Sequence, residues 1–241
     1  MIKKTFTLYL FLLIAGLSVQ GEAAPMTKSA HISAEQIIDN YVKAIGGVSA
    51  IHAINDYKMT GSVNAMGQSL EMIQLFKKPN LYSMSVSMGA TVAQKIVFDG
   101  TTLKTSGMGG SAAFTEGKEF DEVKANAAMC PEMNYIQNGF NLSVGEIEKI
   151  NGNNAYVLYV RKGQQTITEY YDVTTGLKIR ISASLNTPMG EMQQITDYSN
   201  YRPIKGVMFP HLIKQKVANI ETTITITKVE VNTGLTVNEF K

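Results

Sequence analysis

Apolar and polar residues alternate along most of the chain from Asp56 onward, which is the pattern of β-strands with one buried face. The first alternating run covers residues 56–65, and turn residues at 66–68 and 78–80 separate the next two runs. The pair Asp99-Gly100 marks a further hairpin. Together these runs predict a meander of about ten or eleven antiparallel strands.

One run, NLYSMSVSMG at residues 80–89, places methionine where strand interiors usually carry valine, isoleucine or phenylalanine. On three consecutive predicted strands, four methionines fall at inward positions: Met59, Met72, Met84 and Met88. Flexible methionine side chains recur at binding surfaces that accept varied partners, but they also fill gaps in ordinary cores. Taken alone, these strands favour the ordinary core.

Two segments break the alternation and predict helices. Ser33 and Gln36 have the spacing of a capping box, and the amphipathic segment that follows them ends at Gly46-Gly47. We expect this first helix to act as a lid or plug over an apolar interior. Residues 118–129 predict a second helix, and in the last strand a change of phase near Thr227 predicts a β-bulge. The apolar side of the second helix consists of Phe120, Val123 and Ala127.

The N-terminus has the order of a secretory signal: Lys3 and Lys4, an apolar run that ends at Leu17, and then small and polar residues. The run is shorter than the roughly 20 residues of a membrane-spanning helix. We therefore expect cleavage after Ala23, which would leave residues 24–241 as a single exported periplasmic domain. Because no cysteine lies near this site, we expect no lipid anchor.

Charge and cysteine content narrow the function classes. The full chain has 22 basic and 20 acidic side chains, and loss of residues 1–23 removes Lys3, Lys4 and Glu22 to leave a net charge of +1. Such a chain has no electrostatic basis for binding nucleic acid or an anionic membrane surface, so any lipid contact must be apolar. Cys130 is the only cysteine, and we interpret it as a small buried hydrophobic residue.

The sequence offers no nucleophile motif and no metal-binding motif. Three isolated histidines have the pattern of surface or packing residues: His31, His52 and His211. Three carboxylates near the start of the second predicted helix are typical of a solvated face: Glu119, Asp121 and Glu122. The segment SGMGG at residues 106–110 lacks the ending of a phosphate loop and predicts a flexible hairpin tip. We expect no catalytic residue, no metal and no cofactor.

Several short motifs occur in a fixed order: Gly46-Gly47, Met59-Thr60-Gly61, Lys78-Pro79-Asn80, Phe98-Asp99-Gly100, Tyr170-Tyr171-Asp172, Thr175-Gly176-Leu177, Asp197-Tyr198, Gly206-Val207-Met208-Phe209-Pro210 and Val237-Asn238-Glu239-Phe240. In this order, and behind a secretory signal, they resemble the outer-membrane lipoprotein-sorting proteins, the LolA-like family of periplasmic carriers. The resemblance covers nearly all of residues 24–241.

The resemblance implies a mainly β (α+β) fold, in which one strongly curved antiparallel sheet forms an open half-barrel with helices as a lid. It also implies an apolar cavity between sheet and lid that holds the acyl chains of lipoproteins or other lipids. Each buried methylene would contribute about 0.8 kcal/mol, so specific polar contacts are not required. We expect Lys78 at the cavity mouth and a lining of Met59, Val63, Leu70, Met72, Tyr82, Met84, Val86 and Met88.

Two departures from the family pattern bear on function. The sorting carriers have an arginine directly before the proline of the turn, whereas this chain has Lys78, and lysine cannot make the same forked contacts. The carriers also continue past their final phenylalanine, whereas this sequence ends at Lys241. The resemblance is therefore also compatible with a relative that binds lipid without sorting lipoproteins.

Three functions compete at this stage. The first is a monomeric periplasmic carrier or chaperone, with lipid or lipoprotein acyl chains and envelope membrane proteins as partners. The second is a non-catalytic interaction or accessory module of the cell envelope, which would have a filled core and an exposed apolar patch elsewhere. The third is an enzyme, which would need titratable groups that converge in a cleft. The sequence shows no such group, so we expect no catalysis.

Overall fold

The computed structural model describes residues 32–163, 165–187 and 190–241. The predicted signal residues 1–23, the cleavage site and His31 lie outside this part of the chain. Within it, no helix has the length and apolar character that crossing a membrane requires.

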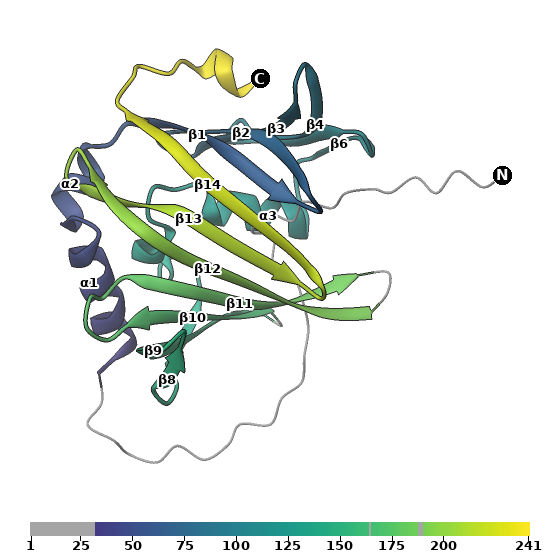
Figure 1. The fold of residues 1–241 in the computed structure, drawn as a ribbon. Helices are drawn as coiled ribbons and strands as arrows, with labels where there is room; N and C mark the ends of the chain where they lie inside the picture. Colours follow the sequence, from purple (N-terminus) through teal and green to yellow (C-terminus); the bar gives the residue numbers. More distant parts are fainter. Residues whose placement is uncertain (1–31, 164, 188–189) are drawn as a thin grey trace.

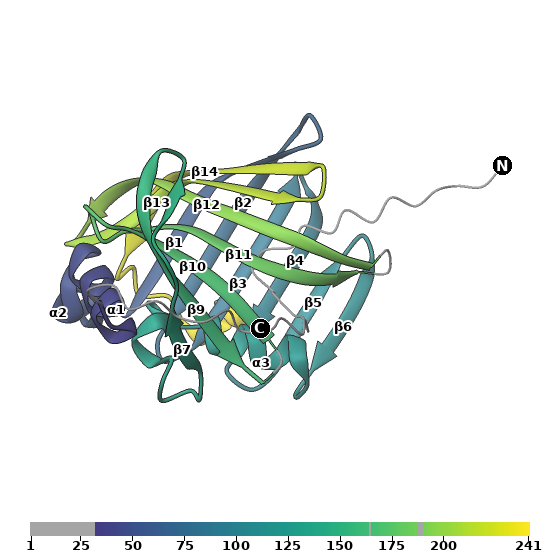
Figure 2. The same ribbon diagram turned by 90° about the horizontal axis from the view of Figure 1, so that it is seen from below.

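Among the described residues, fourteen strands form one antiparallel sheet: β1 (Asp56–Ala65), β2 (Gln68–Lys77), β3 (Leu81–Met88), β4 (Thr91–Phe98), β5 (Leu103–Gly107), β6 (Gly110–Phe114), β7 (Asn141–Val144), β8 (Glu148–Ile150), β9 (Asn153–Lys162), β10 (Gln165–Asp172), β11 (Lys178–Thr187), β12 (Gly190–Ile204), β13 (Val207–Val217) and β14 (Ile220–Val231). Their order is β6-β5-β4-β3-β2-β1-β14-β13-β12-β11-β10-β9-β7, with β8 paired to β9. Because β6 and β7 form the two edges, the sheet is not closed, and it curves into a half-barrel (Figures 1 and 2).

The predicted fold class is confirmed, with more strands than the ten or eleven expected. Strands β5 to β8 have only three to five residues each, too few for alternation to be visible in the sequence. The predicted bulge is also confirmed. Thr60 of β1 pairs with Lys228 of β14 and Gly61 pairs with Ile226, so Thr227 is the extra residue between them.

The helices are α1 (Ala34–Ala44), α2 (Gly47–Ala53) and α3 (Lys118–Asn126), and two short 3-10 helices are η1 (Pro131–Asn134) and η2 (Val237–Phe240). The predicted capping box begins α1. The Gln36 backbone N–H donates to Ser33 Oγ at 3.2 Å, and the Ser33 N–H donates to Gln36 Oε1 at 2.8 Å.

Glycine is required at the corner between α1 and α2. Gly46 has φ +124°, and a Cβ there would lie 2.1 Å from the carbonyl oxygen of Gly206. The Met208 N–H donates to the Ile45 carbonyl at 2.9 Å in the same contact. These contacts hold the two helices against the β12–β13 turn, at one end of the half-barrel (Figure 1).

Two apolar clusters fill the inner face of the sheet. The first lies under α1 and α2, and its members include Ile37, Val42, Ile51, Phe76, Leu158 and Phe209. The second lies under α3, and its members include Met72, Met84, Phe98, Leu103, Phe120 and Ile224. A smaller cluster lies on the outer face, where Phe240 of η2 packs on Leu81 and Val97. The inner face therefore has two compartments, each with its own helical cover.

Candidate functional site

The predicted lining residues meet in the compartment under α3. Five of the eight are buried members of this cluster, Val63, Leu70, Met72, Met84 and Val86, and Met59 and Tyr82 are partly buried against it. Met59 also packs against the first cluster. Strand register explains the convergence, because Met72 of β2 lies opposite Val86 of β3, and Met84 lies opposite Ile96 of β4. Same-face partners on neighbouring strands have Cβ atoms about 5 Å apart, so these side chains form a continuous apolar surface.

Met88 is the exception, and its predicted inward position is wrong. The register shift between β3 and β4 leaves Ala93 of β4 as the extra residue, so it does not account for Met88. Met88 is the last residue of β3, and it is 54% exposed. It lies at a hairpin end, outside the cluster that contains the other seven residues.

Helix α3 covers this surface with Phe120 and Val123, and Ala127 directly after its end completes the apolar side predicted from the sequence. The helix ends at Asn126, three residues before the predicted end. The ring of Phe120 packs edge-on against Phe98 at 5.6 Å between centroids. The cover over the predicted lining is thus α3, whereas α1 packs into the other compartment.

Polar groups also face this compartment. On α3, Glu119 and Asp121 are exposed as expected, but Glu122 is buried, so the predicted solvated face holds only in part. Gln94 of β4 lies opposite Val86 on the inner face. Its Oε1 atom is buried and has no hydrogen-bond partner among the described residues.

Lys78 lies in the β2–β3 turn, where its ammonium donates to the carbonyl oxygen of His52 at 2.6 Å. This contact ties the turn to the end of α2. A role for Lys78 at a cavity mouth therefore stays a prediction, and its observed partner belongs to α2 rather than to α3.

The compartment under α1 contains a buried ionic cluster that the sequence did not reveal. Lys178 of β11 forms ion pairs with Glu132 of η1 and with Glu169 of β10, the latter at 2.7 Å. Tyr135 donates to Glu169 Oε1 at 2.8 Å, and Tyr171 donates to Oε2 at 2.6 Å. Lys178, Glu132 and Glu169 are all buried, so the cluster fixes η1 and the segment after α3 to the sheet.

The charges of this cluster stabilise one another against burial. Burial alone would lower the pKa of Lys178, but the carboxylates of Glu132 and Glu169 outweigh it and hold that pKa well above the ordinary value. Burial raises the pKa of Glu132, yet Lys178 more than compensates, and the net pKa lies below the ordinary value of 4.5. Burial, with the nearby Glu169 charge, raises the pKa of Tyr135 and Tyr171.

A pattern in the sequence could have indicated part of this cluster. Glu169 stands in phase with Ile167 and Tyr171 on β10, so alternation alone places a carboxylate on the inner face. A buried carboxylate needs a partner, and Lys178 begins the next strand. Glu132 lies in a loop segment without alternation, 46 residues from Lys178, and nothing in the sequence pairs them.

The cluster does bring titratable groups together, as catalysis requires, but each of these groups forms an ion pair or hydrogen bond with another member of the cluster. Cys130 belongs to the same arrangement: it is buried, and its thiol donates to Glu132 Oε2 at 3.1 Å. Burial raises the pKa of this thiol, which disfavours a nucleophilic thiolate. Among the described residues, no group of three His, Cys, Asp or Glu side chains could hold a metal ion.

No family model and no curated protein matches the sequence. Solved structures do match the fold. A LolA superfamily protein, NE2245 from Nitrosomonas europaea, is 13% identical, with a TM-score of 0.58 over 88% of this chain and 98% of that one. A DUF1329 family protein from Desulfovibrio piger is 12% identical, with a TM-score of 0.57 over 86% of this chain and 96% of its own.

A third similar structure is an outer membrane lipoprotein-sorting protein domain from Vibrio parahaemolyticus. It is 10% identical, with a TM-score of 0.56 over 86% of this chain and 97% of that chain. At these identities the likeness shows a shared fold, which is the one that the sequence motifs predicted.

Proposed function

Starting from the LolA-like fold of this chain, we propose that it is a non-catalytic periplasmic carrier that binds the acyl chains of lipoproteins or other lipids. The ligand lies between strands β1 to β5 and α3. The observation that carries this proposal is the continuous apolar inner face formed by seven residues under a short separate helix. The sorting function in the name of the Vibrio protein belongs to that protein and agrees with this proposal.

The energetics allow α3 to give way to a ligand. Its two large apolar contacts, Phe120 and Val123, each stabilise the closed state by about 1.5–3 kcal/mol, or roughly 3–6 kcal/mol together. An acyl chain gains about 0.8 kcal/mol per buried methylene, so burial of about four to eight methylenes offsets the displacement of α3. Methionines on the opposite wall can change rotamer to follow a flexible chain.

Gln94 adds a polar preference to this apolar site. A buried acceptor without a donor costs about 1–3 kcal/mol. A ligand that brings a hydroxyl or amide N–H next to the acyl chain would remove that cost at Gln94 Oε1. Acyl chains that carry such a group should therefore bind more tightly than plain hydrocarbon.

A second candidate function, the envelope interaction module with a filled core, is favoured by one observation. Met84 and Met72 are 0% and 1% exposed, so packing with their neighbours covers them fully. In that case, the methionines serve ordinary packing, and α3 remains closed.

The test is to recover the exported chain from a bacterial periplasm and compare its native and denaturing mass spectra. The organic extract is then analysed for lipids, and uptake of a fluorescent fatty acid is measured. We expect an acyl-containing adduct and saturable uptake. A clean apo mass without uptake would favour the filled-core module.

Two tryptophan variants locate the site. Val86→Trp fills the inner face and should lower uptake, whereas Ile73→Trp places the same side chain on the outer face of the neighbouring strand and should not. Circular dichroism identifies a variant that fails to fold. Equal uptake by two folded variants would contradict the proposed location.

A further inference from the structure

The free end of the half-barrel is formed by hairpin turns. In an antiparallel meander, every turn from an odd-numbered strand to the next even-numbered strand lies at the same end of the sheet. The turns β1–β2, β3–β4, β5–β6, β9–β10 and β13–β14 therefore share one end, and α1 and α2 lie at the other (Figure 1). We call the residues at four of these turns, on the part of the end formed by β1 to β6 and by β13 and β14, the tip rim: 64–69, 87–92, 106–111 and 217–220.

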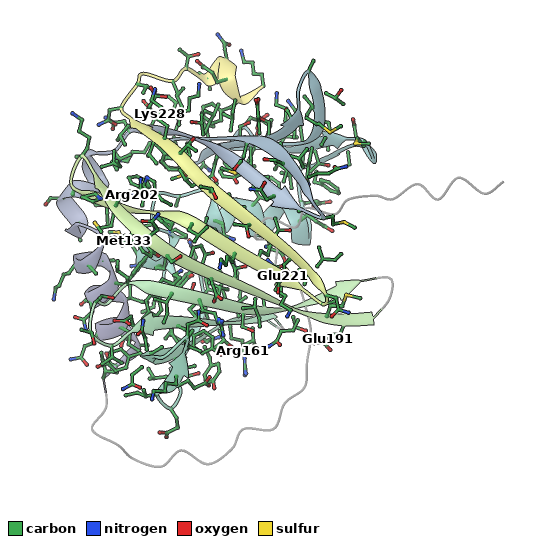
Figure 3. The ribbon with its side chains drawn as sticks, in the orientation of Figure 1. Met133, Arg161, Glu191, Arg202, Glu221 and Lys228 are labelled. Atoms are coloured by element: carbon green, nitrogen blue, oxygen red, sulfur yellow. The ribbon has the colours of Figure 1, made fainter. Side chains whose placement is uncertain are left out.

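Each of these turns exposes at least one large apolar side chain. The exposed residues and their exposed fractions are Met66 at 59%, Met88 at 54%, Val92 at 45%, Met108 at 75% and Ile220 at 49%. Scattered exposed hydrophobic residues are normal, but a row of them at one end of a molecule marks a contact surface. Figure 3 shows sulfur atoms among the side chains at this end.

The tip rim contains no charged residue in any of its four segments. Turns at the opposite end carry Lys77 and Lys78, Asp99, Asp172 and Lys205. The nearest charges beside the tip rim include Glu221, labelled in Figure 3, which pairs with Lys216 at 3.7 Å. The uncharged stretch is therefore the part of this end formed by β1 to β6 and by β13 and β14, because the β9–β10 turn at the same end carries Arg161 and Lys162.

We propose that the tip rim inserts into the interfacial region of a lipid bilayer. Its apolar side chains stand on four separate turns rather than on one flat surface, which suits several shallow anchors in a fluid phase better than a shape-matched protein interface. The absence of charge in the four segments matches an apolar partner, and the chain as a whole is nearly neutral.

The inner apolar surface continues into the tip rim. Val63 and Ala65 on β1 precede Met66, and Val86 on β3 precedes Met88. Docking by the tip rim would thus bring the inner face close to the acyl layer. This inference extends the proposed function by giving the ligand an entry route, but the evidence for the tip rim does not depend on a bound ligand.

Tryptophan provides the test, because the natural chain has none. Single variants Met66→Trp, Met108→Trp and Ile220→Trp are mixed with vesicles of phosphatidylcholine, alone and with phosphatidylglycerol. Val237→Trp, exposed on η2, is the control. We expect a blue shift and quenching by brominated lipid for the three tip variants, little change with salt, and no response from the control. Unshifted tip variants, or an equal response at position 237, would overturn the proposal.

A second variant separates this inference from the carrier proposal. Replacing Met66, Met108 and Ile220 with serine should weaken vesicle binding by about tenfold per side chain, because each loses apolar burial of that size. Uptake of a soluble fluorescent fatty acid should not change. If the triple serine variant binds vesicles as well as the natural chain does, the tip rim is not a membrane anchor and the proposal is refuted, even if the tip rim binds a protein. If the natural chain takes up no fatty acid, only the carrier proposal is refuted.

Discussion

Replacement of Lys178 by methionine tests how the buried ionic cluster contributes to stability. Methionine keeps much of the side-chain volume but removes the positive charge between Glu132 and Glu169. Breaking a buried ion pair costs about 3–5 kcal/mol, because an uncompensated charge remains in the interior. Here two carboxylates remain, although Tyr135 and Tyr171 still donate to Glu169. We therefore expect a loss of about 3–5 kcal/mol near neutral pH.

The free energy of unfolding should depend on pH in opposite ways in the natural chain and in Lys178→Met. In the natural chain the pKa of Glu132 is lowered on folding, so the unfolded state binds the proton more readily and stability falls with acid below its ordinary pKa of 4.5. The raised pKa of Lys178 contributes stability that is lost only as pH rises above the ordinary lysine range. In Lys178→Met the buried Glu132 loses the charge that lowers its pKa, and burial then favours its protonated form, so stability should increase as pH falls from about 8 to about 5.

The assay is urea unfolding at several pH values, with tyrosine fluorescence or circular dichroism as the signal. A loss of this size shifts the midpoint by roughly 1–3 M urea. Lys228→Met is the matched control, because Lys228 pairs with Glu230 at 2.7 Å but is largely exposed, and such pairs contribute about 0–1 kcal/mol. Adding Glu132→Gln to Lys178→Met should restore part of the loss. A loss equal to that of the control, or one independent of pH, would refute the reasoning.

Other contacts give further predictions that the same unfolding assay can check. Gly46→Ala should destabilise the chain by about 2–4 kcal/mol, since the added Cβ meets the Gly206 carbonyl at a strained φ; a loss below about 1 kcal/mol would contradict that contact. Ser33→Ala should cost about 1 kcal/mol by removing the cap of α1, and Ser33→Asp should cost much less. Asp56→Ala should cost about 1–3 kcal/mol, because this buried carboxylate accepts hydrogen bonds from Thr233 and the next residue; Asp56→Asn should keep part of that stability.

Local rules predicted the elements of this fold where the signal lies within a few residues. The capping box at Ser33 and the bulge at Thr227 depend on near neighbours, and both are confirmed. The Asp99 turn is similar, because its Oδ1 accepts from the backbone N–H groups of Thr101 and Thr102. Short strands such as β8 were missed because three residues are too few to establish a period.

The candidate site shows the same limit. Alternation predicted seven residues that pack around one cluster, but it misplaced Met88, because alternation does not show where a strand ends and its side chains become exposed. The ionic cluster joins a loop residue, Glu132, to two strands much later in the chain, and its partners are set by the curvature of the sheet. The pattern of residues within a short segment does not indicate that curvature, so it could not predict the partners of Glu132.

The pairing of β1 with β14 has a consequence for how the molecule acquires its structure. The pairing of β1 with β14 joins the half of the sheet that contains β1 to β6 to the half that contains β7 to β14. In this pairing Tyr57 lies opposite Val231, so the first strand of the sheet meets the last. Closure of so long a loop is entropically costly, and such distant pairings make folding slow. The half-barrel can therefore be completed only after its last strand has been synthesised. A chain that lacks β14 would have no strand to join β1 to β13, so the two halves of the sheet depend on this one late pairing.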